Sequence, residues 1–350
     1  MKNIIRVLIV DDSAYVRKVI RQMLSRSPFI EVVDVAHDGA DALEKIERLG
    51  DQVDVVTLDL LMPKMDGVEF IKHQMARRPL PVIVVSIANE GGEKFLAALD
   101  AGAVDFVHKP TALATEKMFD ISDELIAKVK TASTVPIHCL ANINEFPSST
   151  PLPRPRISSS GKIELVAIGI STGGPQALAF LIPQLPENLP VPVVVVLHMP
   201  VGYTNMYAQR LDRLCSLDVK EAQAGDVVRP GEVLIAQAGH HLSFKRNHDQ
   251  NVVVHLHTKP FDLPHRPSVD VMFQSAAEIY KDRVLGVVMT GMGSDGKQGA
   301  AWIKSHGGSV FTEAEESCVV YGMPRTVVEA GLSDRSIPLN QMAKAIVDAL

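Results

Sequence analysis

The chain has 350 residues and a mass of 38.0 kDa, more than one hydrophobic core usually organises, so two domains are expected. Its composition, 46% hydrophobic and 22% charged, excludes a disordered tail, a coiled coil and a collagen-like fibre. The net charge of -6 and the pI near 6.1 argue against general nucleic-acid binding, because such domains usually carry a basic stripe.

No signal peptide and no membrane span are indicated, since the first apolar run is short and no stretch approaches 18 uncharged apolar residues. The three cysteines, at positions 139, 215 and 318, form no close-spaced pair, so neither a disulfide framework nor a zinc ribbon is indicated. We therefore expect a cytoplasmic protein that does not itself insert into a membrane.

Short β-branched runs alternate with amphipathic stretches in the first part of the chain. The runs cover residues 4–10, 31–35, 53–58, 81–86 and 104–107, and the helical patterns lie near 14–26, 39–49, 67–77, 92–101 and 116–131. Five βα units imply a doubly wound parallel sheet. We expect this α/β unit over residues 1–131.

A composition change marks the domain boundary. Of the 17 residues from 145 to 161, ten are Pro, Ser or Thr, so residues 132–161 are expected to form a flexible linker. Strand-like runs return at 164–170, 191–198 and 284–290, each followed by a helical pattern, whereas 219–257 indicates short strands with turns. Residues 162–350 therefore indicate a second doubly wound α/β domain with a β-rich insertion.

Polar side chains follow the strands of the first domain. Asp11 and Asp12 end its first strand, Asp59 the third, Ser86 the fourth and Lys109 the fifth. Because ligands bind at the carboxyl ends of parallel strands, these groups should share one edge. Clustered carboxylates suit Mg²⁺, and such a site can accept a phosphoryl group whose charge Lys109 neutralises. Taken singly, each Asp is more simply a helix cap and Lys109 a solvated side chain.

These motifs resemble the receiver domain of two-component response regulators over about residues 1–130. The resemblance rests on residues 10–13, 58–59, 62–67, 86 and 109–110, and it implies the flavodoxin-like fold. It also implies that Asp59 accepts a phosphoryl group from a histidine kinase and that Ser86 and Phe106 form a switch pair. Mg²⁺ would be held by Asp12, Asp59 and the Leu61 carbonyl, with Asp11 assisting.

The first strand of the second domain enters a glycine-rich turn that exposes Ser171. Residues 169–173 satisfy G-x-S-x-G, a short pattern that also occurs by chance. A phosphate-binding loop is the competing interpretation, although the Walker lysine and the G-x-G-x-x-G pattern are missing. A purely structural turn with a capping serine is the other alternative.

Two further strand ends carry partners for a serine nucleophile. His198 follows the run at 191–197, and Asp295 lies in the glycine-rich loop after 284–290. A serine hydroxyl needs an imidazole base and an acid that fixes the tautomer of that base. Backbone amides in the loop that contains Met292 are candidates for an oxyanion site. Alone, His198 would be a satisfied or surface histidine and Asp295 a helix cap.

The chain order Ser171, His198, Asp295 differs from that of the α/β-hydrolase fold. The motifs instead resemble the chemotaxis protein-glutamate methylesterase and glutamine deamidase (CheB) family, including residues 266–270 and 317–325. The resemblance implies a catalytic triad of these three residues, with Thr172 and the Met292 amide at the oxyanion site. It implies that methyl-accepting chemoreceptors are the substrates, that methanol is released and that a CheA-type kinase is the phosphodonor.

Three alternatives remain open from the sequence. Histidines crowd residues 240–265 and could indicate a metal site, although no carboxylate or cysteine joins them at a recognised spacing, and we expect no cofactor in this domain. His241 is expected beside the substrate cleft, by resemblance. A receiver-controlled transcription factor would need a recognition helix and a basic face. A receiver-controlled module that binds a partner without catalysis is the last alternative.

The two-domain organisation also suggests how activity is controlled. Both sites are expected at strand-end edges, and the linker is long enough to let one domain face the other. We expect the receiver to restrain the hydrolase by covering its cleft, and phosphorylation to release it.

Overall fold

The computed structural model describes residues 4–87, 92–109, 121–136 and 163–350. The chain divides into two compact units, Met1–Glu145 and Phe146–Leu350, which are treated separately below. Most of the expected linker at 132–161 lies outside the described residues, as does the start of the helical pattern expected at 116–131.

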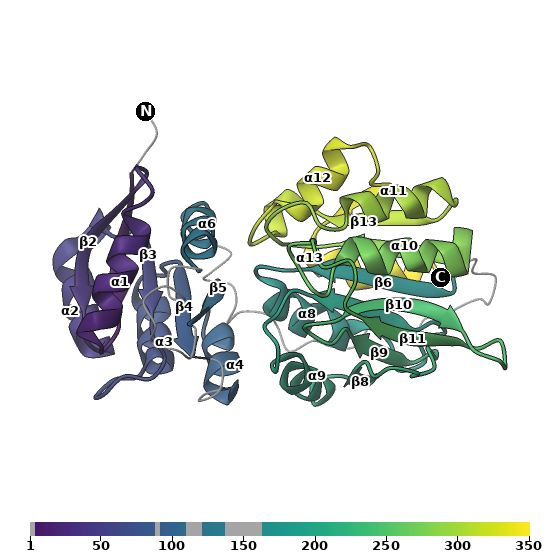
Figure 1. Ribbon diagram of the computed structural model, residues 1–350, viewed down its shortest axis with the longest axis horizontal. Coiled ribbons are helices and arrows are strands. Elements are labelled where there is room, and N and C mark those ends of the chain that lie inside the picture. The colour runs from purple at the N-terminus through teal and green to yellow at the C-terminus, as the bar shows by residue number, and fades with distance from the viewer. Residues whose placement is uncertain (1–3, 88–91, 110–120, 137–162) are drawn as a thin grey trace. The chain divides into compact units, whose positions relative to one another are not determined.

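The first unit contains a five-stranded parallel sheet in the order β2-β1-β3-β4-β5 (Figure 1). The five βα units predict a parallel sheet, and this strand order is the flavodoxin-like one that the receiver resemblance implies. The strands are β1 (Ile5–Val10), β2 (Ile30–Ala36), β3 (Val55–Leu58), β4 (Val82–Ile87) and β5 (Asp105–Lys109). All four residues of β3 are buried, which explains why the central strands appear in the sequence as continuous apolar runs.

Helices cover both faces of this sheet. They are α1 (Ala14–Leu24), α2 (Gly39–Leu49), α3 (Gly67–Arg77), α4 (Gly92–Asp100) and α6 (Ser122–Ala132). In α1 the buried positions recur every three or four residues, and Ser13 caps the helix by accepting a hydrogen bond from the Val16 amide at 3.4 Å. Helix α1 packs beside α6, whereas α3 contacts both α2 and α4.

The second unit is built on a seven-stranded parallel sheet in the order β14-β13-β12-β6-β7-β9-β8. Its strands are β6 (Leu165–Ile170), β7 (Val193–Leu197), β8 (Asp218–Glu221), β9 (Glu232–Ile235), β12 (Val284–Val288), β13 (Ser309–Glu313) and β14 (Arg335–Ile337). Within the sheet, β7 pairs with one edge of β6, and β12, which comes later in the chain, pairs with the other edge of β6. The edge beside β6 is therefore the switch point where α/β sheets usually bind ligands.

Helices also cover both faces of the second sheet (Figure 1). Helices α10 (Val269–Tyr280), α11 (Lys297–Ser305) and α12 (Met323–Glu329) share one face, while α8 (Gly174–Leu181) packs against α13 (Leu339–Asp348) and α9 (Thr204–Asp212) lies beside β8. The stretch 219–257, expected as short strands with turns, divides in two. Strands β8 and β9 extend the main sheet, whereas β10 (His241–Arg246) and β11 (Val252–His257) form an antiparallel hairpin on α10.

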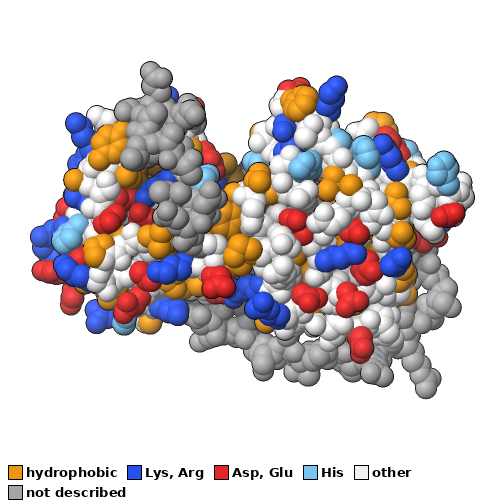
Figure 2. Space-filling view, turned by 60° about the horizontal axis from the view of Figure 1, so that its bottom comes forward, with side chains coloured by type: hydrophobic (Ala, Val, Ile, Leu, Met, Phe, Trp, Pro, Cys, Tyr) orange, Lys and Arg blue, Asp and Glu red, His pale blue; other side chains and the backbone are white. Residues whose placement is uncertain are grey.

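No helix within the described residues combines the length and the apolar character needed to cross a membrane. On the face drawn in Figure 2, acidic and basic side chains are interspersed over the described surface.

Candidate functional site

The carboxyl edge of the first sheet carries the expected acidic cluster. The carboxylates of Asp11, Asp12 and Asp59 offer ligand oxygens that all lie within 4.8 Å of one another. The Lys109 Nζ lies 2.6 Å from the Asp11 Oδ2 and 2.6 Å from the Asp59 Oδ2. Asp11, Asp59 and Lys109 are buried, whereas Asp12 is exposed. Four of the five side chains predicted for this site are therefore in one cluster.

The chemistry of this donor set fits a hard divalent cation. Carboxylate oxygens are the ligands that Mg²⁺ prefers, and their spacing allows one ion to join them. Burial raises the pKa of Asp11, although Lys109 opposes that shift. Asp12 is exposed, so the cluster is in contact with solvent on that side.

The expected switch residues lie on the strands next to the cluster. Ser86 is half-buried on β4 and faces His108 in the β4–β5 register. Phe106 on β5 packs edge-to-face against Phe95 of α4, with 4.7 Å between ring centroids. The Lys128 Nζ of α6 lies 4.6 Å from the Phe106 ring centroid and donates a hydrogen bond to the Phe106 carbonyl. Phe106 is thus positioned between α4 and α6.

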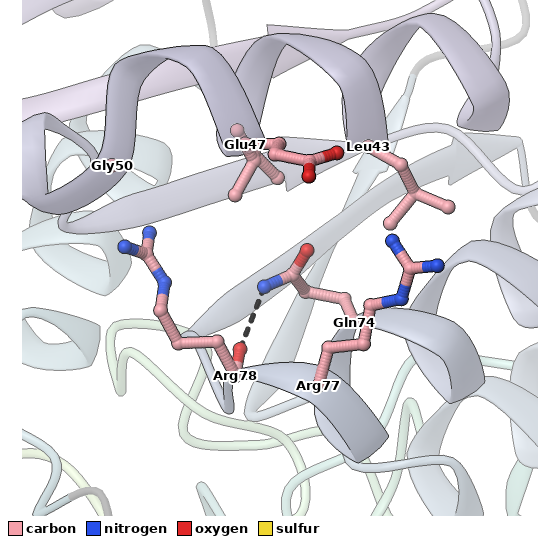
Figure 3. Close-up of a pocket in the computed structure, with 7 residues that line it drawn as sticks. Leu43, Glu47, Gly50, Gln74, Arg77 and Arg78 are labelled. Atoms are coloured by element: carbon pink, nitrogen blue, oxygen red, sulfur yellow. Dashed lines mark hydrogen bonds between the residues drawn. The ribbon is translucent and has the colours of Figure 1, made fainter.

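A separate hollow of about 270 Å³ lies between α2 and α3 (Figure 3). Leu43 and Glu47 of α2 face Gln74 and Arg77 of α3 across it, and the Gln74 side chain donates a hydrogen bond to the Arg78 carbonyl at 2.6 Å. Glu47, Gln74 and Arg77 belong to the C-terminal halves of their helices and Leu43 lies near the middle of α2, away from the strand ends that carry Asp11 and Asp59. The hollow is therefore not part of the acidic cluster.

Ser171 and His198 are neighbours at the carboxyl edge of the second sheet. Ile170, the last residue of β6, pairs with Leu197, the last residue of β7, so Ser171 and His198 occupy the next position of that ladder. The His198 amide also donates a hydrogen bond to the Ile170 carbonyl at 3.1 Å. On the other side of Ser171, its amide donates to the carbonyl of Thr290, just beyond β12.

The turn after Ser171 needs a glycine at position 173, because of both its backbone conformation and its close packing. Gly173 has a φ of 76°, in the left-handed region that glycine adopts without strain. A Cβ at this position would lie 2.6 Å from the Val319 Cβ, so a side chain would also clash with the neighbouring segment. Pro175 follows in the first turn of α8, where its missing amide hydrogen costs nothing. The serine is therefore on a sharp strand-to-helix turn.

His198 is bound to Asp295 as the sequence predicts. The His198 Nε2 lies 2.9 Å from the Asp295 Oδ2, and both side chains are more than nine-tenths buried. An ionised carboxylate can only accept hydrogen bonds, so the His198 Nε2 is assigned as the donor to Asp295. The Nδ1 atom is buried and has no hydrogen-bond partner among the described residues. Its lone pair is therefore available to a hydroxyl.

Asp295 is fixed by the start of α10. The Ser268 hydroxyl donates to Asp295 Oδ1 at 2.9 Å, the Val269 amide donates to Oδ2 at 2.8 Å, and the Asp270 amide donates to Oδ1 at 2.9 Å. Although burial opposes the charge, the hydrogen bonds from His198 and from these amides hold the pKa of Asp295 well below its usual range. Asp295 is therefore an anion at neutral pH.

Asp270 in turn accepts hydrogen bonds from the segment that follows Asp295. Its Oδ1 accepts hydrogen bonds from the Gly296 amide at 2.9 Å and from the Gly299 amide at 2.7 Å, which are at the start of α11. Burial, together with the nearby charge of Asp295, raises the pKa of Asp270 to about 6. The pKa values of the two aspartates thus move in opposite directions because their surroundings differ.

The loop that contains Met292 lies against the serine turn. A Cβ on Gly291 would be 2.8 Å from the Ser171 Cβ, so the backbone at Gly291 touches the serine directly. The Gly291 amide donates to the Val320 carbonyl at 3.0 Å, and the Met323 amide donates to the Gly291 carbonyl at 2.8 Å. The structure thereby brings Met292 next to the serine turn that also carries Thr172.

The histidines of residues 240–265 divide between two places. His265 stacks on His198, with 4.0 Å between ring centroids and 19° between ring planes. His241 is fully buried, and its Nε2 lies 3.0 Å from the Pro260 carbonyl. His255 and His257 instead contact the Ser243 hydroxyl. Among the described residues, the group with metal-binding spacing is the aspartate cluster of the first unit.

The sequence assigned no role in this site to several residues that position it. Ser268 and Thr290 contact the site through long-range hydrogen bonds, and Asp270 and His265 reach it only because α10 begins there. Glu313 is fully buried at the end of β13. An acid at the end of an apolar strand was the available signal for Glu313, but the strand Ser309–Glu313 was itself not predicted.

The two units together define a class of protein. A flavodoxin-like sheet with an acidic cluster and a buried lysine at its carboxyl edge is typical of response regulators, and here it is followed by an α/β output unit. Residues 7–118 match the response regulator receiver domain family, and residues 166–346 match the CheB methylesterase family.

Known proteins agree with this class. A protein-glutamate methylesterase/protein-glutamine glutaminase of Myxococcus xanthus is 48% identical over 339 residues, covering 97% of this chain and 96% of that protein. One from Pyrococcus abyssi is 38% identical and covers 99% and 94%. The crystal structure of the Thermotoga maritima CheB methylesterase catalytic domain has a TM-score of 0.52 and 43% identity, covering 54% of this chain and 99% of that one. The chain belongs to the CheB methylesterase family.

Proposed function

We propose that this chain is a phosphorylation-controlled esterase that removes methyl esters from glutamate side chains of methyl-accepting chemoreceptors and releases methanol. We also propose that it deamidates specific receptor glutamines. The names of the full-length relatives support both activities. The single observation that carries the proposal is the placement of Ser171 opposite His198, just beyond the paired ends of β6 and β7, with the His198 imidazole bound to an ionised Asp295.

The proposed reaction begins with the hydroxyl of Ser171. Its oxygen attacks the ester carbonyl while the His198 Nδ1 takes the hydroxyl proton, and the Nε2–H of the resulting imidazolium stays hydrogen-bonded to Asp295. The negative charge then develops on the former carbonyl oxygen. Backbone N–H groups of Thr172 and Met292 are proposed to stabilise it, because both lie beside Ser171.

The tetrahedral intermediate collapses when the bond to the methoxy oxygen breaks. The imidazolium of His198 returns its proton to this oxygen, so methanol leaves and a glutamyl ester of Ser171 remains. A water molecule then repeats the sequence, giving its proton to Nδ1 and releasing the free glutamate side chain. With a glutamine substrate the same steps release ammonia, since the amide nitrogen takes the place of the methoxy oxygen.

For the first unit we propose that Asp59 accepts a phosphoryl group from a CheA-type histidine kinase. Asp11, Asp12 and Asp59 would hold Mg²⁺, with the Leu61 carbonyl as a further ligand. When bound, this ion supplies charge neutralisation at the phosphoryl oxygens. The Lys109 ammonium already contacts Asp59 at 2.6 Å and would pair with the added negative charge, and the Ser86 hydroxyl would donate to it.

The switch pair Ser86 and Phe106 is proposed to transmit this change. Phe106 packs against α4 and contacts Lys128 of α6, so a change at Ser86 and Phe106 would alter the surface formed by these helices. We propose that the unphosphorylated receiver restrains the esterase and that phosphorylation relieves this restraint. A difference of about 1.4 kcal/mol between the two states already changes the active fraction tenfold when the restrained form dominates.

A serine-directed phosphonate tests the proposed chemistry. The reagent should form a covalent adduct on Ser171, seen by mass spectrometry of peptides, and His198→Gln should abolish labelling because the base is lost. Ser268 is the matched control within the same protein. It also lies in the site, but its hydroxyl donates a hydrogen bond to Asp295 and has no base beside it in the proposed mechanism, so it should not be labelled. A chain that only binds a partner would remain unlabelled at Ser171 and would release no methanol.

A further inference from the structure

Glu313 is a buried acid that the proposed mechanism does not use. It ends β13 and is 0% exposed. Its Oε2 accepts a hydrogen bond from the Thr290 amide at 2.9 Å, and its Oε1 accepts one from the Ser317 hydroxyl at 3.0 Å. Burying a carboxyl group costs free energy, and the hydrogen bonds from Thr290 and Ser317 offset that cost. An apolar residue at position 313 would leave the buried Thr290 amide without this acceptor.

Thr290 connects this carboxyl to the serine turn. Its carbonyl accepts a hydrogen bond from the Ser171 amide at 3.0 Å, and its hydroxyl donates to the Thr172 carbonyl at 2.9 Å. The Val320 amide in turn donates to the Thr290 hydroxyl at 3.0 Å. Thr290 therefore contacts two consecutive residues of the turn, and Glu313 is the acceptor for its amide hydrogen.

The end of the β12–β13 ladder explains why a side chain is needed here. The ladder pairs Val288 with Thr312 and then stops, so the Thr290 amide has passed the last paired position of β13. The Glu313 side chain supplies the acceptor that the backbone no longer offers. We infer that Glu313 is a positioning residue for the esterase reaction, holding the Ser171–Thr172 turn in place through Thr290. This inference rests on the proposed function.

The hydrogen-bond partners of Glu313 can be satisfied whether its carboxyl group is ionised or neutral. Burial raises the pKa of Glu313 to about 7, and its oxygen can accept from Thr290 whether or not the acid is ionised. The Ser317 hydroxyl also lies 3.2 Å from the Ala314 carbonyl, so it can donate there when a neutral acid donates to Ser317. Glutamine has nearly the same shape as the neutral acid and, like it, offers one carbonyl oxygen as an acceptor and a donor group beside it. Glu313→Gln is therefore the conservative variant.

Glu313→Met keeps most of the side-chain volume but removes the acceptor. Without it, the Thr290 amide is buried and unpaired, and the turn should shift to satisfy it. Because a shift of about 1 Å in a reacting group costs on the order of 100-fold in rate, we expect kcat to fall about 10- to 100-fold. The ester-binding surface is unchanged, so KM should stay within about threefold of wild type.

The test measures methanol release from methylated receptor by the full chain and three variants. Glu313→Met should lose kcat, Glu313→Gln should restore it to within about threefold of wild type, and the exposed neighbour Glu316→Gln should not change it. A folded Glu313→Met protein with the kcat of wild type would overturn the inference. So would a Glu313→Gln protein as slow as Glu313→Met, because hydrogen-bond geometry would then not be what matters.

Two further measurements keep this test decisive. If Glu313→Met does not fold, Thr290→Val and Thr290→Ser test the second half of the connection, from Thr290 to Thr172, since only serine retains the hydroxyl that donates to Thr172. Equal kcat values for those two variants would contradict the inference. Failure of the proposed function is distinguishable, because it would appear as absence of methanol release by the wild-type chain itself, whatever the variants do.

Discussion

Asp270 and Asp295 cap each other's helices. Asp295, which precedes α11, accepts the amide hydrogens of Val269 and Asp270 at the start of α10, and Asp270 accepts those of Gly296 and Gly299 at the start of α11. Each carboxylate satisfies amides that have no partner inside their own helix. The acid that orients His198 is therefore held by the packing of two helices and not by its own loop alone.

The burial of Asp270 between the two helices predicts that its contribution to the stability of the protein depends on pH. Its folded-state pKa of about 6 lies above the ordinary value of 3.8, so the folded protein binds more protons than the unfolded chain between these values. The contribution of Asp270 to the free energy of unfolding therefore falls as pH rises from about 4 to about 6. Asparagine mimics the neutral acid and does not titrate.

Asp270→Asn should accordingly gain stability relative to wild type as pH rises from 4 to 7, and the difference should level off above that range. Trp302 is the one tryptophan of the chain and lies in α11, so its fluorescence reports thermal unfolding of this unit. A difference in unfolding temperature that is constant with pH, or that shrinks as pH rises, would show that Asp270 is not buried as an acid with a raised pKa.

Gly291→Ala should impair the serine without removing any catalytic group. The new Cβ would lie 2.8 Å from the Ser171 Cβ and 2.5 Å from the Met323 Sδ, closer than carbon atoms approach in folded proteins. We expect the turn to shift and the turnover of ester to fall about 10- to 100-fold. Gly225, at a φ of 89°, has open space around it, so Gly225→Ala strains its own backbone without a steric contact and is the control for a glycine replacement far from the serine turn. Equal turnover by both variants would contradict the placement of Gly291.

The fold was largely predictable because its central strands are simple patterns. The runs that became β1, β3, β6, β7 and β12 are apolar and β-branched, since parallel strands are buried on both faces. Strands β13 and β14 were not predicted. The first mixes polar and apolar residues, and the second has only three residues, Arg335–Ile337, with its first two exposed.

The candidate site was predictable only where strand ends carried it. Ser171, His198 and Asp295 follow three apolar runs, so a parallel sheet brings them to one edge. The contacts of Ser268, Thr290 and Glu313 with the site escaped prediction because their partners are 23 to 118 residues away in sequence. Nothing in local spacing distinguishes such a residue from an ordinary helix cap or an exposed acid.

Asp59→Asn should abolish phosphorylation of the receiver. With a small phosphodonor and Mg²⁺, the wild-type chain should take up an acid- and base-labile phosphoryl group, as expected for an acyl phosphate, and the variant should take up none. Asp51→Asn is the matched control, because the Asp51 side chain is fully exposed. Labelling of the Asp59→Asn protein equal to wild type would place the acceptor on another residue.

Phosphorylation should raise esterase activity through release of restraint. We expect the phosphorylated chain to hydrolyse receptor ester faster than the unphosphorylated chain, and Asp59→Asn to remain at the lower rate. A chain that begins at residue 162 keeps the whole second sheet and should be faster than the unphosphorylated full chain. If this shorter chain folds and is no faster, the receiver does not act by restraining the esterase.

Methanol release by Ser171→Ala tests the central claim most directly. The wild-type chain should release methanol from a methylated chemoreceptor, and Ser171→Ala should be roughly 10³-fold slower or more while unfolding at the same temperature. Combining it with His198→Ala should add little, because the two residues act as one unit. Near-normal methanol release by a verified Ser171→Ala protein would contradict the assignment of the nucleophile and, with it, the proposed mechanism.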